Sequence, residues 1–183
     1  MFEQADISLI EIRLKLDMLR TTTDPKLFVR SFMDLLEAAG KGFGSILRSD
    51  RGRLPKEFAD WLEARREETE SDELLKLALE PRDSFTESGE NPLLIALEIG
   101  PLSVDDEAPD RMPEGWWTSP GDTERFHAML SRRPLSYRGE ALPQNDPVSV
   151  CSIVNHYLSD LTDEAQARLG TAARADHSLL NTE

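Results

Sequence analysis

The chain has 183 residues, of which 39% are hydrophobic and 31% are charged. This balance is ordinary for a folded globular protein and excludes a collagen-like or wholly disordered chain. The net charge of -14 at pH 7 opposes any broad coating of a phosphate backbone, because counterion release rewards binding only where cations contact phosphates.

The sequence carries no signal for export or membrane insertion. Its first residues lack the cationic and apolar regions of a signal peptide, and no apolar run approaches the roughly 20 residues that span a bilayer. Cys151 is the only cysteine, so no disulfide can form within the chain and the core must stabilise itself. We therefore expect a cytoplasmic protein with no membrane contact.

Two long helices are predicted at the start. Apolar residues recur at three- and four-residue steps between residues 7 and 19, which places them on one helical face. Asp24-Pro25 then supplies a capping carboxylate and a proline at the first helical position, so a second helix begins there and extends to Leu47. Gly40, Gly42 and Gly44 inside this helix predict close approach by another helix.

Two shorter helices follow. Leu54-Pro55 opens a third helix with apolar residues at helical spacing, among them Trp61. Ser71 is the predicted N-cap of a fourth helix with acids in its first turn, and this helix should end near Leu79.

The middle of the chain gives weaker signals. Residues 93–99 are apolar, but the run is too short to separate a buried helical turn from a strand. Residues 100–120 are rich in proline, glycine and acids and predict a long surface connection, in which Trp116 and Trp117 are expected to pin the loop to the core. Residues 123–130 are predicted as a short helix, and residues 133–144 as irregular structure.

The last helix is predicted from Asp146-Pro147, which repeats the signal of a cap followed by proline. Its apolar face runs as far as Leu169, and the polar residues 174–183 have little to bury and should fray. We therefore predict an all-α fold: one bundle of about five to six helices over residues 1–173, with a long proline-, glycine- and acid-rich connection before the last helix.

One segment suggests a family. Leu74-Leu75-Lys76-Leu77-Ala78-Leu79-Glu80-Pro81-Arg82 is an apolar helical turn that ends in an arginine, and a polar stretch then leads to Asn91-Pro92-Leu93. With the long second helix and the aromatic helix around Trp61, this segment resembles the HEPN superfamily of helical domains. The resemblance covers roughly the first two thirds of the chain, and the last helix fits it loosely.

The resemblance implies a catalytic site made of an arginine and a histidine, and at the matching positions this sequence has only the arginine. In catalytic HEPN domains an arginine and a nearby histidine from each of two subunits meet at a dimer interface and cleave RNA; the arginine stabilises charge on the phosphate and the imidazole handles protons. Arg82 matches the arginine, but no residue from Ser84 to Gly89 titrates near neutrality as an imidazole does. The resemblance therefore implies a non-catalytic interaction or regulatory module, homodimeric through apolar helix faces.

The alternative is a ribonuclease in which Arg82 acts with an atypical partner. Glu87 could accept a proton, but a second anion beside an RNA phosphate would repel the substrate, and the other partners would be His127 or His156. Arg82 can also be interpreted as a helix-terminal cation paired with a neighbouring acid.

Other candidate chemistry is sparse. Glu124 and His127 are three apart and could share one helical face as metal ligands, but a single such pair is too little for a metal site, and no cofactor is predicted. Cys151 is interpreted as a small core residue, with His156 at a poor angle for partnership. Two arginine-rich groups are interpreted as solvated surface cations: Arg48, Arg51, Arg53 and Lys56, and Arg132, Arg133 and Arg138.

Overall fold

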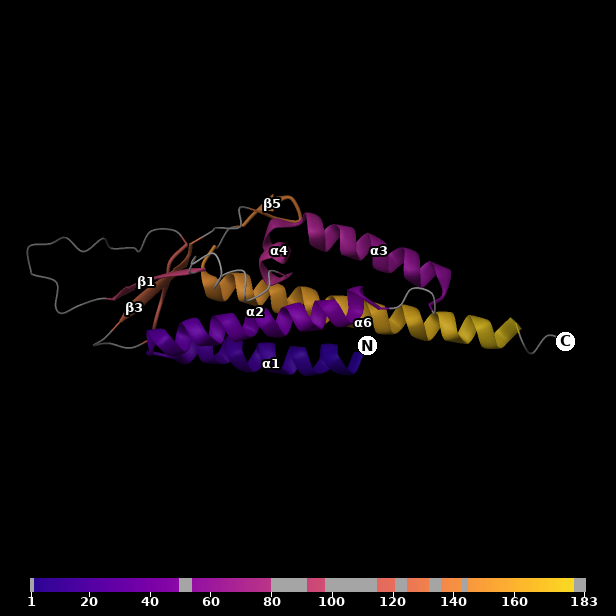
Figure 1. Ribbon diagram of the computed structural model, residues 1–183, viewed down its shortest axis with the longest axis horizontal. Helices are drawn as coiled ribbons and strands as arrows, with labels where there is room; N and C mark the ends of the chain where they lie inside the picture. The colour runs from indigo at the N-terminus through magenta and orange to yellow at the C-terminus, as the bar shows by residue number, and fades with distance from the viewer. Residues whose placement is uncertain are drawn as a thin grey trace, which may run out of the picture.

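The protein is described by a computed structural model that covers residues 2–49, 54–79, 92–97, 115–120, 125–131, 136–142 and 145–179, with only the backbone for residues 172–179. Its described part is mostly helical and also contains a small antiparallel sheet (Figure 1). The prediction of an all-α fold is therefore wrong in one respect. The described strands all lie between α4 (Glu73–Leu79) and α6 (Pro147–Leu179), where the sequence predicted a short helix and irregular connections and left residues 93–99 open between a helical turn and a strand.

Two long antiparallel helices form one side of the bundle. Helix α1 spans Phe2–Thr21 and α2 spans Pro25–Leu47. The turn between them is fixed by Asp24, whose carboxylate accepts a 2.8 Å hydrogen bond from the Lys26 backbone N–H. This confirms the predicted cap, which satisfies one of the donors that a helix start leaves free.

Helix α6, Pro147–Leu179, packs against both of these helices. Oδ1 of Asp146 accepts hydrogen bonds from the backbone N–H groups of Val148 and Ser149, both at 3.0 Å, which confirms the second predicted cap. The backbone remains helical to Leu179, beyond residue 173, where the sequence analysis ends the bundle.

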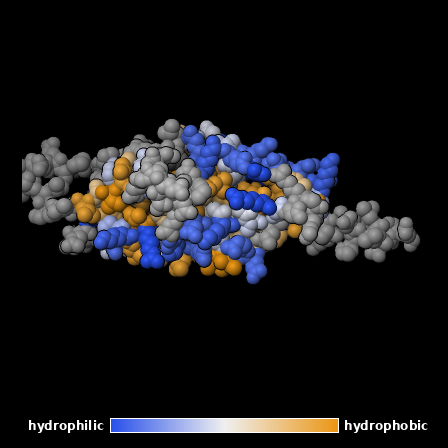
Figure 2. All heavy atoms as spheres, viewed as in Figure 1, coloured by the Kyte–Doolittle hydropathy of each residue, from blue (hydrophilic) through white to orange (hydrophobic). Residues whose placement is uncertain are grey.

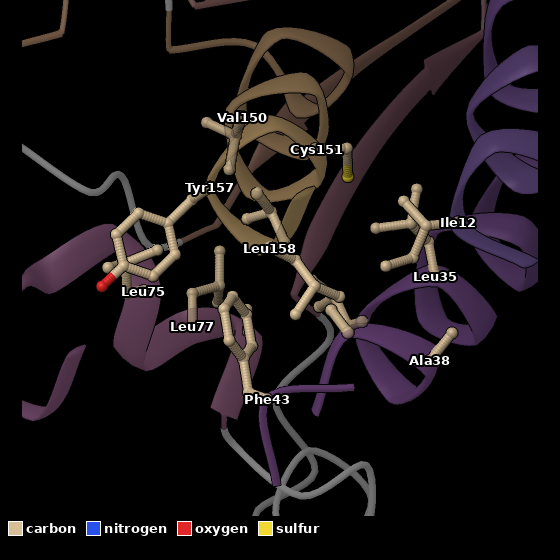
Figure 3. Packing of buried hydrophobic residues seen from close by; sticks show 14 of the residues in the cluster. Ile12, Leu35, Ala38, Phe43, Leu75, Leu77, Val150, Cys151, Tyr157 and Leu158 are labelled. Carbon is tan, nitrogen blue, oxygen red and sulfur yellow. The ribbon is translucent and has the colours of Figure 1, made fainter. Parts of the chain in front are cut away.

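One hydrophobic core joins the helices. Figure 3 shows side chains from α1, α2, α4 and α6 converging on it. Its wholly buried members include Ile12, Leu35, Phe43, Leu75, Val154 and Leu158.

Two of the three glycines in α2 allow helices to approach closely, as predicted. A Cβ atom on Gly42 would lie 2.6 Å from Cδ2 of Leu158 on α6 and 3.0 Å from Cβ of Ser8 on α1. A Cβ atom on Gly40 would lie 3.3 Å from the carbonyl oxygen of Ala78 on α4. The close contacts of α2 with three helices therefore depend on these two residues having no side chain.

Helix α3, Lys56–Ser71, and helix α4, Glu73–Leu79, cover the other side of α2. The predicted cap of α4 is displaced by one residue: Asp72, not Ser71, accepts hydrogen bonds from Leu74 and Leu75. The hydroxyl of Ser71 instead donates to the Glu68 carbonyl, because Ser71 is the last residue of α3. The predicted end of α4 at Leu79 is confirmed.

A three-stranded antiparallel sheet, in the order β1-β3-β2, closes one end of the bundle (Figure 1). The strands are β1 (Leu93–Leu97), β2 (Trp117–Thr118) and β3 (Phe126–Leu130). In register, Leu93 pairs with Leu130 and Trp117 with Ala128. The helix predicted over residues 123–130 is therefore wrong, since Phe126, Ala128 and Leu130 are buried in alternation and follow the two-residue period of a strand.

Aromatic rings fasten this sheet to the bundle. The ring of Phe28, in the first turn of α2, stacks on Trp117 with centroids 4.6 Å apart and meets the edge of Phe126 at 5.3 Å. Trp117 thus packs against the core, as the sequence predicted.

A second, two-stranded sheet lies in the segment predicted to be irregular. Strands β4 (Ser136–Tyr137) and β5 (Glu140–Ala141) form a hairpin that contacts α4. Its turn contains Arg138 and Gly139, both with positive φ, at 52° and 77°. Glycine adopts this conformation without strain, whereas arginine rarely does.

Candidate functional site

Arg82 and Glu87, the candidate catalytic residues of the ribonuclease alternative, lie outside the described residues. The helix that precedes them is described. Helix α4 ends at Leu79 and is anchored to the core by the buried residues Leu74, Leu75 and Ala78. The proposed roles of Arg82 and Glu87 therefore remain predictions.

The structure does not support Glu124 and His127 as a pair of metal ligands on one helical face. Glu124 lies outside the described residues, and His127 is in strand β3 rather than on a helix. Nδ1 of His127 lies 3.0 Å from the Thr118 hydroxyl on β2, and the ring packs edge-on against Trp116 at 6.5 Å. Within the described ranges, no group of three or more His, Cys, Asp or Glu side chains could hold a metal ion. The idea of two ligands on one helical face is therefore wrong for His127.

Cys151 is a core residue, as predicted. It is wholly buried, and burial, followed by the nearby charge of Asp146, raises the pKa of its thiol far above the ordinary value. His156 lies on the exposed side of α6, where its Nδ1 donates a 2.8 Å hydrogen bond to the Ser152 carbonyl. A protonated, buried thiol and an exposed imidazole do not make a nucleophilic pair.

Helix α1 has a second apolar face that the sequence analysis did not separate from the core face. Its buried residues, such as Ile12 and Leu16, face α2 and α6. Ile7, Ile10 and Leu14 stand three and four positions apart on the opposite side and are 43%, 66% and 59% exposed. Figure 2 shows hydrophobic residues exposed between hydrophilic ones along the lower edge of the molecule, over α1. A surface helix normally has one apolar face, so this second face is a candidate contact surface.

The charges along α1 are divided between its two halves. Residues 2–11 carry three acids, Glu3, Asp6 and Glu11, and no base. Residues 12–21 carry Arg13, Lys15 and Arg20 and one acid, Asp17. The helix is therefore acidic at one end and basic at the other, with the apolar face between them.

Arg138 is exposed, as predicted for a surface cation, and the structure adds specific contacts that the sequence did not indicate. Its guanidinium lies 5.5 Å from the ring centroids of both Tyr137 and Tyr157, and its Nε donates a 3.1 Å hydrogen bond to Glu68. Its backbone N–H donates to the cap residue Asp72. The sequence signal for this hairpin turn was Gly139, because glycine is a strong marker of tight turns.

A ladder of alternating charges continues from this point along the junction of α3 and α6. Glu68 pairs with Arg65, Arg65 with Glu164 at 3.1 Å, and Glu164 with Arg168 at 2.9 Å. The Trp61 indole N–H also donates to Glu164 at 2.9 Å. The alternation of sign and the buried aromatic neighbours make this network a tether between α3 and α6.

A cleft opens where the C-terminal part of α2 meets α3 and the end of α4. It encloses about 310 Å³ and is lined by Phe43, Gly44, Leu47, Arg48, Arg66, Glu70 and Leu79. From the sequence, Arg48 is predicted to be a solvated surface cation and Gly44 a packing residue. A Cβ atom on Gly44 would meet nothing within 4 Å, so the packing explanation is wrong for this glycine.

The fold and these surfaces define a mostly helical bundle closed by a small sheet. Comparison of the chain with known protein families, with curated proteins and with solved structures found no match. Among the described residues, no helix combines the length and apolar character required to cross a membrane.

Proposed function

We propose that this chain is a non-catalytic, HEPN-like helical interaction or regulatory module that acts as a homodimer. The observation that carries the proposal is the outer face of α1, where Ile7, Ile10 and Leu14 leave apolar surface in water opposite the core face. Each Å² of apolar surface removed from water contributes about 25 cal/mol, so pairing this face is favourable. The missing histidine after Arg82 argues for the non-catalytic form.

The charge distribution along α1 supports a second copy of this chain as the partner. In an antiparallel pair of α1 helices, Ile7 of one copy lies beside Leu14 of the other, and Ile10 lies near the two-fold axis. The acidic half, with Glu3, Asp6 and Glu11, then faces Arg13 and Arg20 of the basic half, since Lys15 is already paired with Asp34 of its own chain at 2.7 Å. A parallel pair would set three acids against three acids, so the same surface fits itself in one orientation.

The contact must extend beyond three side chains, because specific interfaces bury about 800 Å² on each partner. Helix α1 has 20 residues and is therefore about 30 Å long, so the charged flanks form the rim around the apolar centre. As the only cysteine, Cys151 fits the reducing cytoplasm, where we place the module.

Sedimentation equilibrium at micromolar concentration tests this function. We expect a dimer for the natural chain and a monomer for Ile10→Glu, since a buried charge on the two-fold axis would face its own copy. Leu94→Glu is the matched control, because Leu94 is 49% exposed on strand β1, away from α1. A natural chain that sediments as a strict monomer, or an Ile10→Glu dimer as stable as the control, contradicts the proposal.

The alternative is a ribonuclease in which Arg82 acts with an atypical partner; it is supported by the sequence resemblance and by an α4 helix that ends at Leu79, three residues before Arg82. Its test is RNA cleavage by the natural chain and by Arg82→Ala, with Glu87→Gln as a second variant. Equal background rates in all three proteins exclude the ribonuclease, whereas a rate lost only with Arg82 would replace the non-catalytic proposal.

A further inference from the structure

Packing against other helices does not explain why residue 44 is a glycine. A glycine inside a helix costs about 0.5–1 kcal/mol relative to alanine. Gly40 and Gly42 are explained by atoms that a Cβ would meet at 3.3 Å and 2.6 Å, whereas a Cβ on Gly44 would meet nothing within 4 Å. No element of the described chain therefore requires Gly44 to lack a side chain. Gly44 does line the cleft between α2, α3 and α4, where any side chain would take up space.

The cleft has an apolar floor and a charged rim. Phe43 and Leu47 are almost wholly buried, and with Leu79 they line its apolar part. The rim carries two arginines: Arg66, whose Nε donates a 2.7 Å hydrogen bond to Glu70, and Arg48. Within the described ranges, no carboxylate pairs with the Arg48 guanidinium. An apolar floor with one available cation is complementary to a molecule with an apolar body and one negative charge.

The charge and size of the cleft limit the kinds of ligand that it can bind. Among the described lining residues, Arg48 and Arg66 contribute two positive charges and Glu70 one negative, which leaves a single net positive charge. The cleft also lies at the C-terminal end of α2, where the partial negative charge of the helix opposes an anion more strongly the more charges the anion carries. Its volume of about 310 Å³ is at the lower limit of small-molecule sites. These features fit a small monocarboxylate better than a nucleotide or a polyphosphate.

We propose that this cleft binds a small amphipathic monocarboxylate, with its carboxylate on Arg48 and its apolar body over Phe43, Leu47 and Leu79. Gly44 is then the residue that keeps the site open. The proposal does not depend on self-association, since the cleft contains no residue of α1.

The test uses anilinonaphthalene sulfonate, a fluorescent probe with an apolar body and one negative charge, on the full chain. We expect saturable binding at one site per chain, displaced by octanoate but not by octylamine, which has the same chain length and the opposite charge. Arg48→Ala should weaken binding about ten-fold, the factor produced by losing one charge-assisted hydrogen bond. Displacement by octylamine as efficient as by octanoate, or an unchanged affinity in Arg48→Ala, overturns the proposal.

Gly44 provides a matched pair of variants. Gly44→Leu should fill the cleft and abolish probe binding, whereas Gly44→Ala, which adds one carbon atom, should retain it. Both variants should keep the circular dichroism and thermal stability of a folded helical protein, because the space beside Gly44 is open. A folded Gly44→Leu protein that binds the probe as the natural chain does contradicts the assignment. The monomeric Ile10→Glu variant should bind the probe normally, which separates this site from the outer face of α1.

Discussion

The backbone N–H of Arg138 donates a 2.6 Å hydrogen bond to Oδ2 of Asp72, 66 residues earlier in the chain. Oδ1 of the same carboxylate accepts hydrogen bonds from Leu74 and Leu75 at the start of α4, at 2.9 Å and 3.0 Å. One nearly buried side chain thus caps a helix and fastens the β4–β5 hairpin to it.

Asp72→Ala should therefore lower the free energy of unfolding by about 2 kcal/mol, since it removes an N-cap and leaves buried donors without an acceptor. Urea denaturation measures this loss. Ser71→Ala is the control: Ser71 is the cap predicted from the sequence but not the one observed, and its replacement should change the stability by less than about 0.5 kcal/mol. A larger effect at Ser71 than at Asp72 would contradict the observed cap.

Substitutions at Arg138 should separate backbone strain from side-chain contacts. Arg138→Ala loses the tyrosine and Glu68 contacts but keeps a positive φ of 52°, whereas Arg138→Gly loses the same contacts and relieves the strain. We expect both variants to be less stable than the natural chain, and the glycine variant to be more stable than the alanine variant by about 1 kcal/mol. Thermal unfolding measures the order, and a more stable alanine variant would refute it.

Gly42 and Gly44 should respond in opposite directions to the same change. Gly42→Ala places a methyl group 2.6 Å from Leu158 and should destabilise the bundle by about 1–3 kcal/mol despite its better helix propensity. Gly44→Ala meets open space and should stabilise the protein by about 0.5–1 kcal/mol. Parallel urea titrations of the two variants test this, and shifts of the same sign would show that the packing at α2 is misassigned.

Glu164 should make the stability depend on acid pH. Burial alone would raise the pKa of its carboxyl, but hydrogen bonds from Arg168 and Trp61 and the charge of Arg65 outweigh burial and hold the pKa below its ordinary 4.5. A carboxyl with a lowered folded pKa contributes stability that is complete above the unfolded pKa and is lost as the pH falls through the folded pKa.

Glu164→Gln should therefore be less stable than the natural chain at pH 7, and the difference should shrink as the pH falls below 4.5. Urea titrations of both proteins across this range measure it. Arg66, which pairs with Glu70 outside this network, provides the control: Arg66→Gln should not remove the acid dependence attributed to Glu164. A Glu164→Gln deficit that stays constant down to pH 3 would contradict the lowered pKa.

The helices and their starts could be predicted from the sequence because their signals are local. Asp24-Pro25 and Asp146-Pro147 each provide a capping carboxylate and a proline within two positions, and the observed helices begin at those prolines. The buried face of α1 likewise follows from the three- and four-residue spacing of Ile12, Leu16 and Leu19.

The sheet could not be predicted from local signals as the helices could, because its strands are short and their pairing partners are distant in the sequence. The alternation of Phe126, Ala128 and Leu130 covers only five residues, and it becomes a strand through pairing with β1, whose residues lie 29 to 37 positions before their partners. The hairpin that contains Arg138 depends in the same way on a contact with Asp72 across 66 residues.

By itself, then, the sequence determined the long helices of the bundle, the prolines at which α2 and α6 start and the faces that turn inward, since each of these follows from neighbours within one or two turns. Only the tertiary structure decided that Asp72 serves two elements, that Gly42 is required where Gly44 is not, and that α1 keeps an apolar face outside the core. Those facts depend on atoms brought together from distant parts of the chain, and such distances are set by packing rather than by spacing along the sequence.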